Sequence, residues 1–149
     1  MKVCAFTGHR NIYEYDFDEP LLERVISDLI KNGFTRFLCG MAVGFDLKAA
    51  QIVLSLKERY NIELVACLPC ENQSERFSER NKILYRDVLS KCDEVVVLEK
   101  EYTNGCMLRR DRYLVDNSDI LVCFLRRQQG GTYYTVNYAK KCGKKIIEL

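Results

Sequence analysis

The chain has 149 residues, 48% apolar side chains and a formal charge of +2, so we expect residues 1–149 to form a single domain around one core. The charge and the pI of about 8.1 exclude the strongly basic balance of a protein dedicated to nucleic acid, so any cationic site must be local. No stretch approaches the roughly 20 apolar residues of a membrane span, and the apolar run at the N-terminus is too short for a signal peptide, which predicts a cytoplasmic protein without membrane contacts.

Strand-like and helix-like stretches alternate along the whole chain. An apolar run at 3–8 precedes a helix that begins at about Asp18, where Asp18 caps the first turn, Pro20 lies early in it and apolar residues recur at helical spacing until Gly33. Further strands are predicted at 36–40, 62–68, 94–99, 119–125 and 144–149. Further helices are predicted at 46–60, 74–90 and 106–115, and a last one follows the GGT sequence at 130–132 and ends at about Lys141.

The predicted strands are apolar along their whole length, which is typical of a sheet that is covered on both faces. Helices between successive strands act as crossovers between parallel strands. The sequence therefore predicts an α/β fold with a Rossmann-like, doubly wound, mainly parallel six-stranded sheet and helices on both faces. No linker or change in composition divides the chain.

The eight cysteines do not form the pattern of a disulfide scaffold. Cys4, Cys39, Cys67 and Cys123 fall in or at the end of apolar runs that we predict to be buried strands, where reduced cysteine behaves as a small hydrophobic residue. Cys67 and Cys70 form a CxxC motif, which elsewhere supplies half a zinc site or a redox pair, but neither a second motif nor a pair of histidines follows. We therefore favour a packing role for both and predict no metal site.

Glycines follow four of the first five predicted strands, at the edge where ligands bind in sheets of this kind. Glycine lets the chain turn sharply and bring backbone N–H groups close to an anion, while the next helix N-terminus favours negative charge. Glycine also simply ends strands, but agreement among several loops at one edge favours a phosphate pocket. Neither GxGxxG after the first strand nor a P-loop motif is present, so a standard dinucleotide enzyme and a P-loop NTPase are not supported.

Several segments together resemble the small bacterial members of the SLOG superfamily, which is named for the DNA-processing protein Smf/DprA and the LOG phosphoribohydrolases and includes YpsA-like proteins. They are TGHR at 7–10, GMAVGFD at 40–46 with Ala49 and Ala50, EYTNGCMLRRDRYLVDNSD at 101–119, and GGT at 130–132. The similarity covers essentially the whole chain. It implies a Rossmann-like fold and a nucleotide or nucleotide-derivative ligand, and it identifies no cofactor and no reaction.

The hypothesis is a binding or sensing pocket for a small, phosphate-bearing, nucleotide-like ligand. The residues expected to line it are Gly8, His9, Arg10, Gly40, Gly44, Asp46, Arg110, Gly130, Gly131 and Thr132. Arg110 would neutralise the phosphate through charge-assisted hydrogen bonds. Asp46 is favoured as the N-cap of its helix, and in a family-like site it would accept hydrogen bonds from a ribose. His9, predicted to be exposed in its loop, is either a ligand contact or general acid, or part of an ordinary polar turn.

The first alternative is a hydrolase of N-glycosidic bonds of the LOG type. LOG enzymes carry an arginine in the helix before a strand and then PGGxGTxxE, whose glutamate is catalytic. The arginine position matches Arg110, but the glutamate position falls on Thr135, whose neutral hydroxyl can neither carry that charge nor act as a strong base. Whether the chain is an enzyme stays open. The candidate substitutes are Asp46, Glu71, Asp116 and Asp119, the last of which is expected to be structural.

The second alternative is single-stranded DNA binding, because GMAVGFD with the following alanines resembles the corresponding DprA loop. Phosphate contacts and stacking platforms would then come from Arg109, Arg110, Arg112, Arg126, Arg127, Tyr102, Tyr113, Tyr133 and Tyr134. The near-neutral total charge favours a small ligand instead. Superfamily members often pair through their helices, so the resemblance also implies a homo-oligomer.

Overall fold

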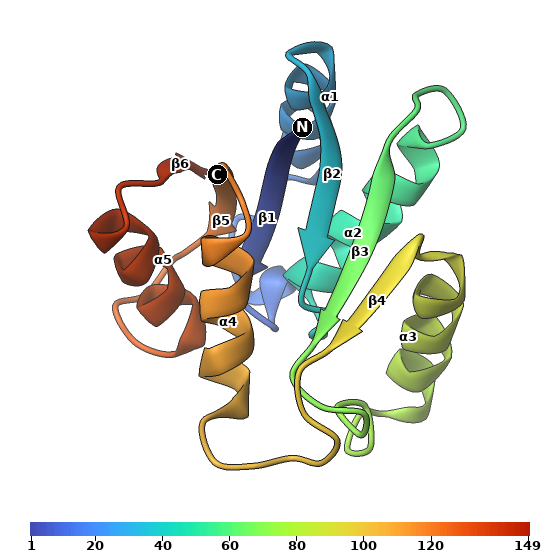
Figure 1. The fold of residues 1–149 in the computed structure, drawn as a ribbon, viewed down its shortest axis with the longest axis vertical. Coiled ribbons are helices and arrows are strands. Elements are labelled where there is room, and N and C mark those ends of the chain that lie inside the picture. The colour runs from blue at the N-terminus through green and yellow to red at the C-terminus, as the bar shows by residue number, and fades with distance from the viewer.

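A computed structural model describes all residues, 1–149, and shows one six-stranded sheet between two layers of helices (Figure 1). The strands are β1 Lys2–Gly8, β2 Phe34–Cys39, β3 Glu63–Leu68, β4 Glu94–Val97, β5 Ile120–Phe124 and β6 Lys145–Glu148. The helices are α1 Glu19–Lys31, α2 Phe45–Leu56, α3 Glu79–Lys91, α4 Cys106–Asp116 and α5 Gly131–Lys141. A short 3-10 helix, η1 Ile12–Glu14, lies in the segment that the sequence predicts to be a polar loop.

The strand order is β4-β3-β2-β1-β5-β6, and every neighbouring pair is parallel. The predicted doubly wound, six-stranded sheet is therefore confirmed. The chain starts in the middle of the sheet at β1, builds outward to β4 and then returns to the other side of β1 to add β5 and β6. All carboxyl ends lie at one edge, the lower one in Figure 1. The order of the strands reverses between β1 and β5, which is where sheets of this class bind ligands.

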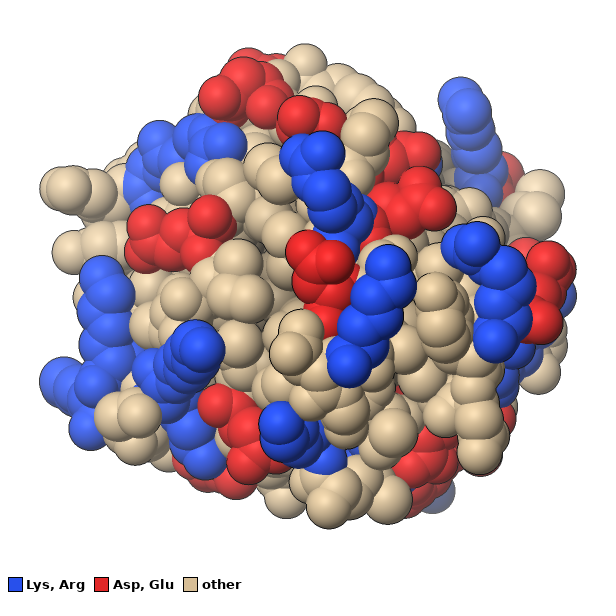
Figure 2. All heavy atoms as spheres, turned by 90° about the horizontal axis from the view of Figure 1, so that it is seen from above, with Lys and Arg blue, Asp and Glu red and all other residues tan.

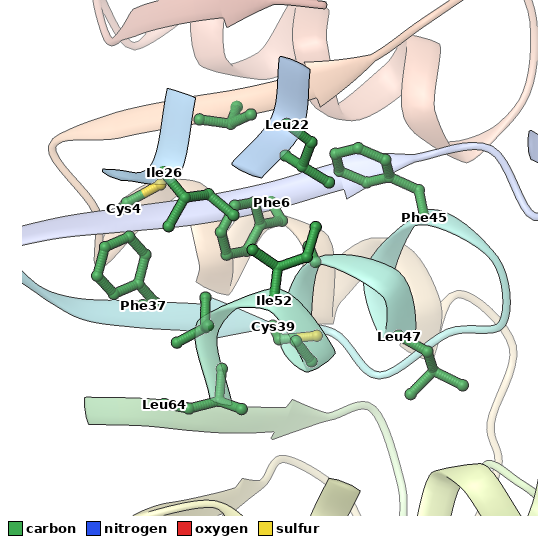
Figure 3. Packing of buried hydrophobic residues seen from close by; sticks show 14 of the residues in the cluster. Cys4, Phe6, Leu22, Ile26, Phe37, Cys39, Phe45, Leu47, Ile52 and Leu64 are labelled. Carbon is green, nitrogen blue, oxygen red and sulfur yellow. The ribbon is translucent and has the colours of Figure 1, made fainter. Parts of the chain in front are cut away.

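Two hydrophobic clusters lie on opposite faces of the sheet, because successive side chains of a strand point to opposite sides. In β1, Cys4 and Phe6 join the larger cluster under α1, α2 and α3, whereas Ala5 joins the smaller cluster under α4 and α5. Aromatic rings fill the larger cluster: the ring centroid of Phe6 lies 6.1 Å from that of Phe37 and 6.4 Å from that of Phe45 (Figure 3). Burial of these apolar surfaces supplies the main driving force for the fold.

Caps decide where the helices begin. The carboxylate of Asp18 accepts a hydrogen bond from the backbone N–H of Leu21 at 3.1 Å, so the predicted cap of α1 is confirmed. The predicted helix from residue 74 begins later, at Glu79, because the hydroxyl of Ser78 caps it by accepting a hydrogen bond from the N–H of Asn81 at 3.2 Å. The edge strand β4 is also less covered than predicted, with Val95 and Val97 partly exposed.

All eight cysteines are free thiols. Cys67 lies inside β3 and Cys70 just beyond it, and both are buried. Burial raises the pKa of the Cys67 thiol to about 12, so it stays protonated at neutral pH. Both side chains therefore pack as small hydrophobic groups. No helix has the length and apolar character needed to span a membrane.

Candidate functional site

A cavity of about 370 Å³ opens at the carboxyl edge of the sheet, where the order of the strands reverses. Its walls come from the end of β1, the loops after β1, β2 and β5, helix α4, and the first turns of α2 and α5. Seven of the ten predicted residues line it, namely Gly8, His9, Arg10, Asp46, Arg110, Gly131 and Thr132. The remaining lining residues are Thr7, Asn11, Tyr15, Ala42, Met107, Leu108, Asp111, Arg127 and Gln129. Gly40, Gly44 and Gly130 lie outside the lining.

Two of the predicted glycines serve packing between loops. A Cβ atom on Gly44 would lie 2.1 Å from the carbonyl oxygen of Arg10, and its φ of +83° disfavours any other residue. A Cβ atom on Gly8 would lie 2.3 Å from the ring of Phe45. The N–H of Phe45 donates to the carbonyl of His9 at 3.1 Å, so the loops after β1 and β2 are held together. These glycines shape the wall of the cavity through close approach of two chain segments.

The guanidinium group of Arg110 is almost completely buried beneath the cavity, with the residue 4% exposed. It lies against Gly40, where a Cβ atom would be 2.9 Å from the guanidinium carbon. Its Nη1 donates to the carbonyl of Gly40, and its Nε donates to Asp111 Oδ1 at 2.8 Å. The Nε2 of Gln73 donates to the same Gly40 carbonyl at 3.1 Å. Arg110 is thus fixed by protein partners, and Gly40 provides the room that the guanidinium occupies.

Asp111 is a charged residue of the site that the sequence patterns did not predict. It is buried, lines the cavity and forms an ion pair with Arg110. Its Oδ2 lies near Gly131: a Cβ atom added to Gly131 would be 3.7 Å from it. The only hint in the sequence was that Asp111 directly follows Arg110 in the predicted helix. Neighbouring residues of a helix ordinarily lie on different faces, so this hint did not place Asp111 in the site.

The prediction that Asp46 caps its helix is wrong. Gly44 is the N-cap residue of α2, and no side chain caps that helix. Asp46 instead lies in the first turn, is only 6% exposed, and accepts a hydrogen bond at Oδ2 from the N–H of Ala42 at 3.3 Å. Burial raises the pKa of this carboxyl to about 7; Arg110 opposes that rise, and Asp111 adds to it. A buried acid that titrates near neutral pH is typical of functional sites.

His9 is buried, with 5% exposure, so the prediction that it is exposed in its loop is wrong. Its Nε2 accepts a hydrogen bond from the N–H of Arg126 at 2.8 Å, and its ring lies 5.3 Å from that of Tyr15. Burial, and then the charges of Arg127 and Arg126, lower the pKa of His9. The ring is therefore neutral at pH 7 with its proton on Nδ1.

The N-terminus of α5 forms the opposite wall and has no side-chain cap and no acidic residue in its first turn. Gly130, at φ +92°, is the N-cap residue. Thr132 is 7% exposed and Thr7 of β1 is 6% exposed, both line the cavity, and neither hydroxyl makes a hydrogen bond within the protein. Arg10 and Arg127 lie at the rim, are exposed and form no ion pair. Hydrogen-bond donors and free positive charge therefore face the same space.

The position matching the LOG glutamate contributes nothing to the cavity. Thr135 is fully buried, and its hydroxyl donates to the carbonyl of Gly131 at 2.7 Å. Among the candidate substitutes, Glu71 and Asp116 lie outside the lining, and Asp116 accepts a hydrogen bond from the hydroxyl of Tyr138 at 2.7 Å. Asp119 accepts one from the N–H of Val3 at 2.8 Å at the far end of the sheet, which confirms its structural role. Only Asp46 of that set lines the cavity.

The basic residues considered for DNA are largely engaged with acidic partners. Arg109 pairs with Glu99 at 2.9 Å, and Arg126 pairs with Asp16 at 2.6 Å. Arg110 is buried, as described above. On the face at the amino ends of the strands, opposite the cavity, basic and acidic side chains are interspersed (Figure 2). Of the five arginines considered for DNA, Arg112 and Arg127 are the two that form no ion pair.

Comparison with known proteins finds relatives over most of the chain. The YpsA family model, described as the YspA SLOG family, matches residues 6–146. The UPF0398 protein lwe1908 of Listeria welshimeri is 32% identical, with 90% of this chain and 81% of that protein covered. A UPF0398 protein of Listeria monocytogenes serotype 4a is 29% identical with the same coverage.

Solved structures show the same fold at low identity. DNA processing protein A (DprA) from Streptococcus pneumoniae has a TM-score of 0.74 at 17% identity, with 99% of this chain and 50% of that chain covered. DprA from Helicobacter pylori, described for its single-stranded DNA binding mode, has a TM-score of 0.72 at 19% identity, with 99% of this chain and 64% of that chain covered. At these identities the likeness concerns the fold.

Proposed function

The chain belongs to the YpsA SLOG family, and we propose that its cavity between the ends of β1 and β5 binds a small phosphate-bearing ligand of the nucleotide or nucleotide-derivative class. The observation that carries the proposal is the uncapped N-terminus of α5 beside Thr7 and Thr132, two largely buried residues whose hydroxyls have no partner within the protein and stay accessible from the cavity. A helix N-terminus presents free N–H groups and a partial positive charge, which favour a phosphate.

The charges around the cavity support an anionic ligand with a polar remainder. Arg10, Arg110 and Arg127 line it, against the carboxylates of Asp46 and Asp111. Arg110 is already paired with Asp111, so the positive charge free to meet a ligand comes from Arg10 and Arg127 at the rim. These two residues are the natural partners of the phosphate, and the buried carboxylates can accept hydrogen bonds from hydroxyl or amino groups of the ligand. This assigns to the rim arginines the neutralising role that the sequence assigned to Arg110.

The volume of about 370 Å³ is at the lower end of the range of small-molecule sites. It is suited to a compact ligand, such as a nucleoside monophosphate or a sugar phosphate. Single-stranded DNA is the weaker candidate. It is suggested by the similarity of fold to the DprA of Helicobacter pylori, which binds single-stranded DNA, but Arg109 and Arg126 are held in ion pairs here.

A thermal-shift screen tests the proposal, because a ligand that binds only the native state raises the melting temperature by mass action. The probes are AMP, GMP, CMP and UMP, ADP-ribose, NAD and oligo-dT. We expect a nucleoside monophosphate to raise the melting temperature at moderate salt, and more than ADP-ribose or NAD does, because the cavity suits a compact ligand. A response to oligo-dT alone, with strong salt dependence, would favour DNA binding instead. Release of free base from a monophosphate would establish a hydrolase in spite of Thr135.

Two variants tie a positive response to this cavity. Arg127→Ala removes a free charge at the rim, and Thr132→Val removes a hydroxyl that is accessible from the cavity while keeping the shape of the side chain. Each is expected to weaken binding of the responding ligand about tenfold, in line with the loss of one hydrogen bond to a charged group. The matched control is Arg112→Ala, an exposed arginine of α4 outside the lining, which should bind as the parent protein does. Equal affinity of all variants would exclude this cavity.

A further inference from the structure

We infer that Asp46 is the proton-carrying group of this pocket, so that binding of a phosphate-bearing ligand takes up a proton at Asp46 and weakens as the pH rises above neutral. The inference rests on the proposed function, since it concerns the regulation of the same site. It makes Asp46 a determinant of affinity rather than a fixed part of the wall.

The geometry leaves Asp46 as the one poorly compensated charge of the buried cluster. Arg110, Asp111 and Asp46 are all buried and line the cavity together. The guanidinium is already committed to Asp111 at 2.8 Å and to the carbonyl of Gly40. Asp46 has only the N–H of Ala42, at 3.3 Å. Two buried carboxylates therefore lie near a single guanidinium that is paired with Asp111 alone, and full ionisation leaves one excess negative charge away from water, which is unfavourable.

The other groups around Asp46 do not remove that excess. From α4 it faces Arg110 and Asp111, whose charges oppose each other, and from the loop after β1 it faces Arg10, a weaker influence at the exposed rim. From β2 it faces Cys39, whose buried thiol stays protonated. The neutral ring of His9 lines the same cavity and adds no charge.

A phosphate entering the cavity adds negative charge close to Asp46. Like charges disfavour one another in a buried site, so the anion stabilises the protonated carboxyl, which can also donate a hydrogen bond to it. The pKa of Asp46 in the free protein is about 7, so the ionised and protonated forms are both populated at neutral pH. Coupling between two binding events is reciprocal: an anion that raises the proton affinity of Asp46 binds more tightly to the protonated protein.

The experiment uses the full chain with sulfate and AMP as probes. Sulfate is informative because its own charge does not change between about pH 6 and pH 9, so any pH dependence belongs to the protein. The carboxyl carbon of Asp46 is followed by NMR against pH, with and without sulfate, and its signal is assigned by its absence in Asp46→Asn. Affinities for sulfate and AMP are then measured at several pH values for the parent protein, Asp46→Asn and Asp87→Asn. Asp87 lies on α3 outside the cavity and serves as the control.

We expect sulfate to raise the pKa of Asp46 by about one unit, which corresponds to an affinity about tenfold lower at pH 9 than at pH 6. Asp46→Asn should bind sulfate with nearly constant affinity over that range, and Asp87→Asn should follow the parent protein. The pH dependence of the affinity for AMP should differ between the parent protein and Asp46→Asn in the same way. The titration of the AMP phosphate affects both proteins equally and so does not change this difference.

Two failures are distinguishable. If AMP and sulfate bind but the parent and Asp46→Asn share one pH profile, the proton-carrying role is wrong while the proposed function stands. If neither probe nor any nucleotide of the thermal-shift screen binds at any pH, the proposed function falls and the inference with it. Should Asp46→Asn fail to fold, the NMR titration of the parent protein decides alone: an Asp46 pKa unmoved by bound sulfate overturns the inference.

Discussion

Gly44 links two loops at the wall of the cavity, and the need for glycine at this position is steric as well as conformational. Its φ is +83°, and a Cβ atom would lie 2.1 Å from the carbonyl oxygen of Arg10. Gly143, after α5, also has a positive φ of +69°, but a Cβ atom there would have no other atom within 4 Å. At Gly143 a substitution causes backbone strain alone, whereas at Gly44 it causes backbone strain and a clash with the chain at Arg10.

We expect Gly143→Ala to lower the free energy of unfolding by about 1–2 kcal/mol through left-handed strain alone. Gly44→Ala should lower it by clearly more, because the loop after β1 must also move, and it should weaken ligand binding. Urea denaturation of both variants measures the difference. Equal losses would show that the contact between the loops carries little energy.

Asp46 also makes stability depend on pH. Its native pKa of about 7 lies above the ordinary value of 3.8, so between these values the native state holds more protons than the unfolded state. Stability from this group is fully present below about pH 3.8 and is lost as the pH rises toward 7. The Asp46→Asn variant has no titrating group at this position, so its stability does not fall in this way as the pH rises.

The stability of Asp46→Asn relative to the parent protein should therefore increase from about pH 4 to pH 7 and remain constant above that. Chemical denaturation at a series of pH values measures it. A pH-independent difference between the two proteins would mean that Asp46 is ionised throughout, as an ordinary surface carboxylate is.

At the scale of elements, two aspartates begin strands by the same pair of hydrogen bonds. The N–H of Asp119 donates to the carbonyl of Val3 at 2.8 Å, and its carboxylate accepts from the N–H of Val3 at 2.8 Å. Asp93 makes the same two bonds to Leu64, each also 2.8 Å long. Each aspartate thus sets the register of its strand against the neighbouring strand.

Asp119→Ala should lower the free energy of unfolding by about 1.5–3 kcal/mol, the range for a hydrogen bond to a charged group. The exchange of the Val3 amide hydrogen should also become faster. Asp87→Ala, which removes an exposed ion pair with Lys91 on α3, should change stability by less than about 0.5 kcal/mol. An unchanged rate for the Val3 amide would contradict a role for Asp119 in the register of β1 and β5.

At the scale of the whole molecule, the single sheet is the common wall of both hydrophobic clusters. Cys4 and Phe6 of β1 belong to one cluster, and Ala5 belongs to the other, so neither face can lose its packing without disturbing the same strand. The site depends on both layers as well, because α2 and α4 lie on opposite faces and each supplies a wall of the cavity.

We therefore predict that the chain unfolds as one cooperative unit. Thermal transitions followed by far-ultraviolet circular dichroism, which reports helices, and by the near-ultraviolet signal of the nine tyrosines should coincide. A ligand of the cavity should move both transitions together. Two separate transitions would show that the helical layers unfold independently and that residues 1–149 do not behave as a single domain.

The sequence by itself determined the elements and the fold class. Apolar runs, glycines and the cap at Asp18 are local patterns, and local patterns control backbone conformation. Continuous apolar strands required a sheet covered on both faces, which is the sheet observed. Seven of the ten residues predicted for the site line the cavity, because parallel strands bring their carboxyl ends to one edge. Its misses in the fold were boundaries, such as the start of α3 at Glu79, where the cap at Ser78 decides, the short helix η1, and the exposure of β4.

Only the tertiary structure decided what the site residues do. His9 is buried because its ring packs against Tyr15 and Phe124. Gly8 and Gly44 are required by close approach to Phe45 and Arg10. Arg110 pairs with Asp111 on α4, and its charge also acts on the pKa of Asp46 on α2. Burial and pairing depend on residues far apart in the chain, and no local pattern encodes them. The charge state of the pocket is therefore a property of the folded molecule.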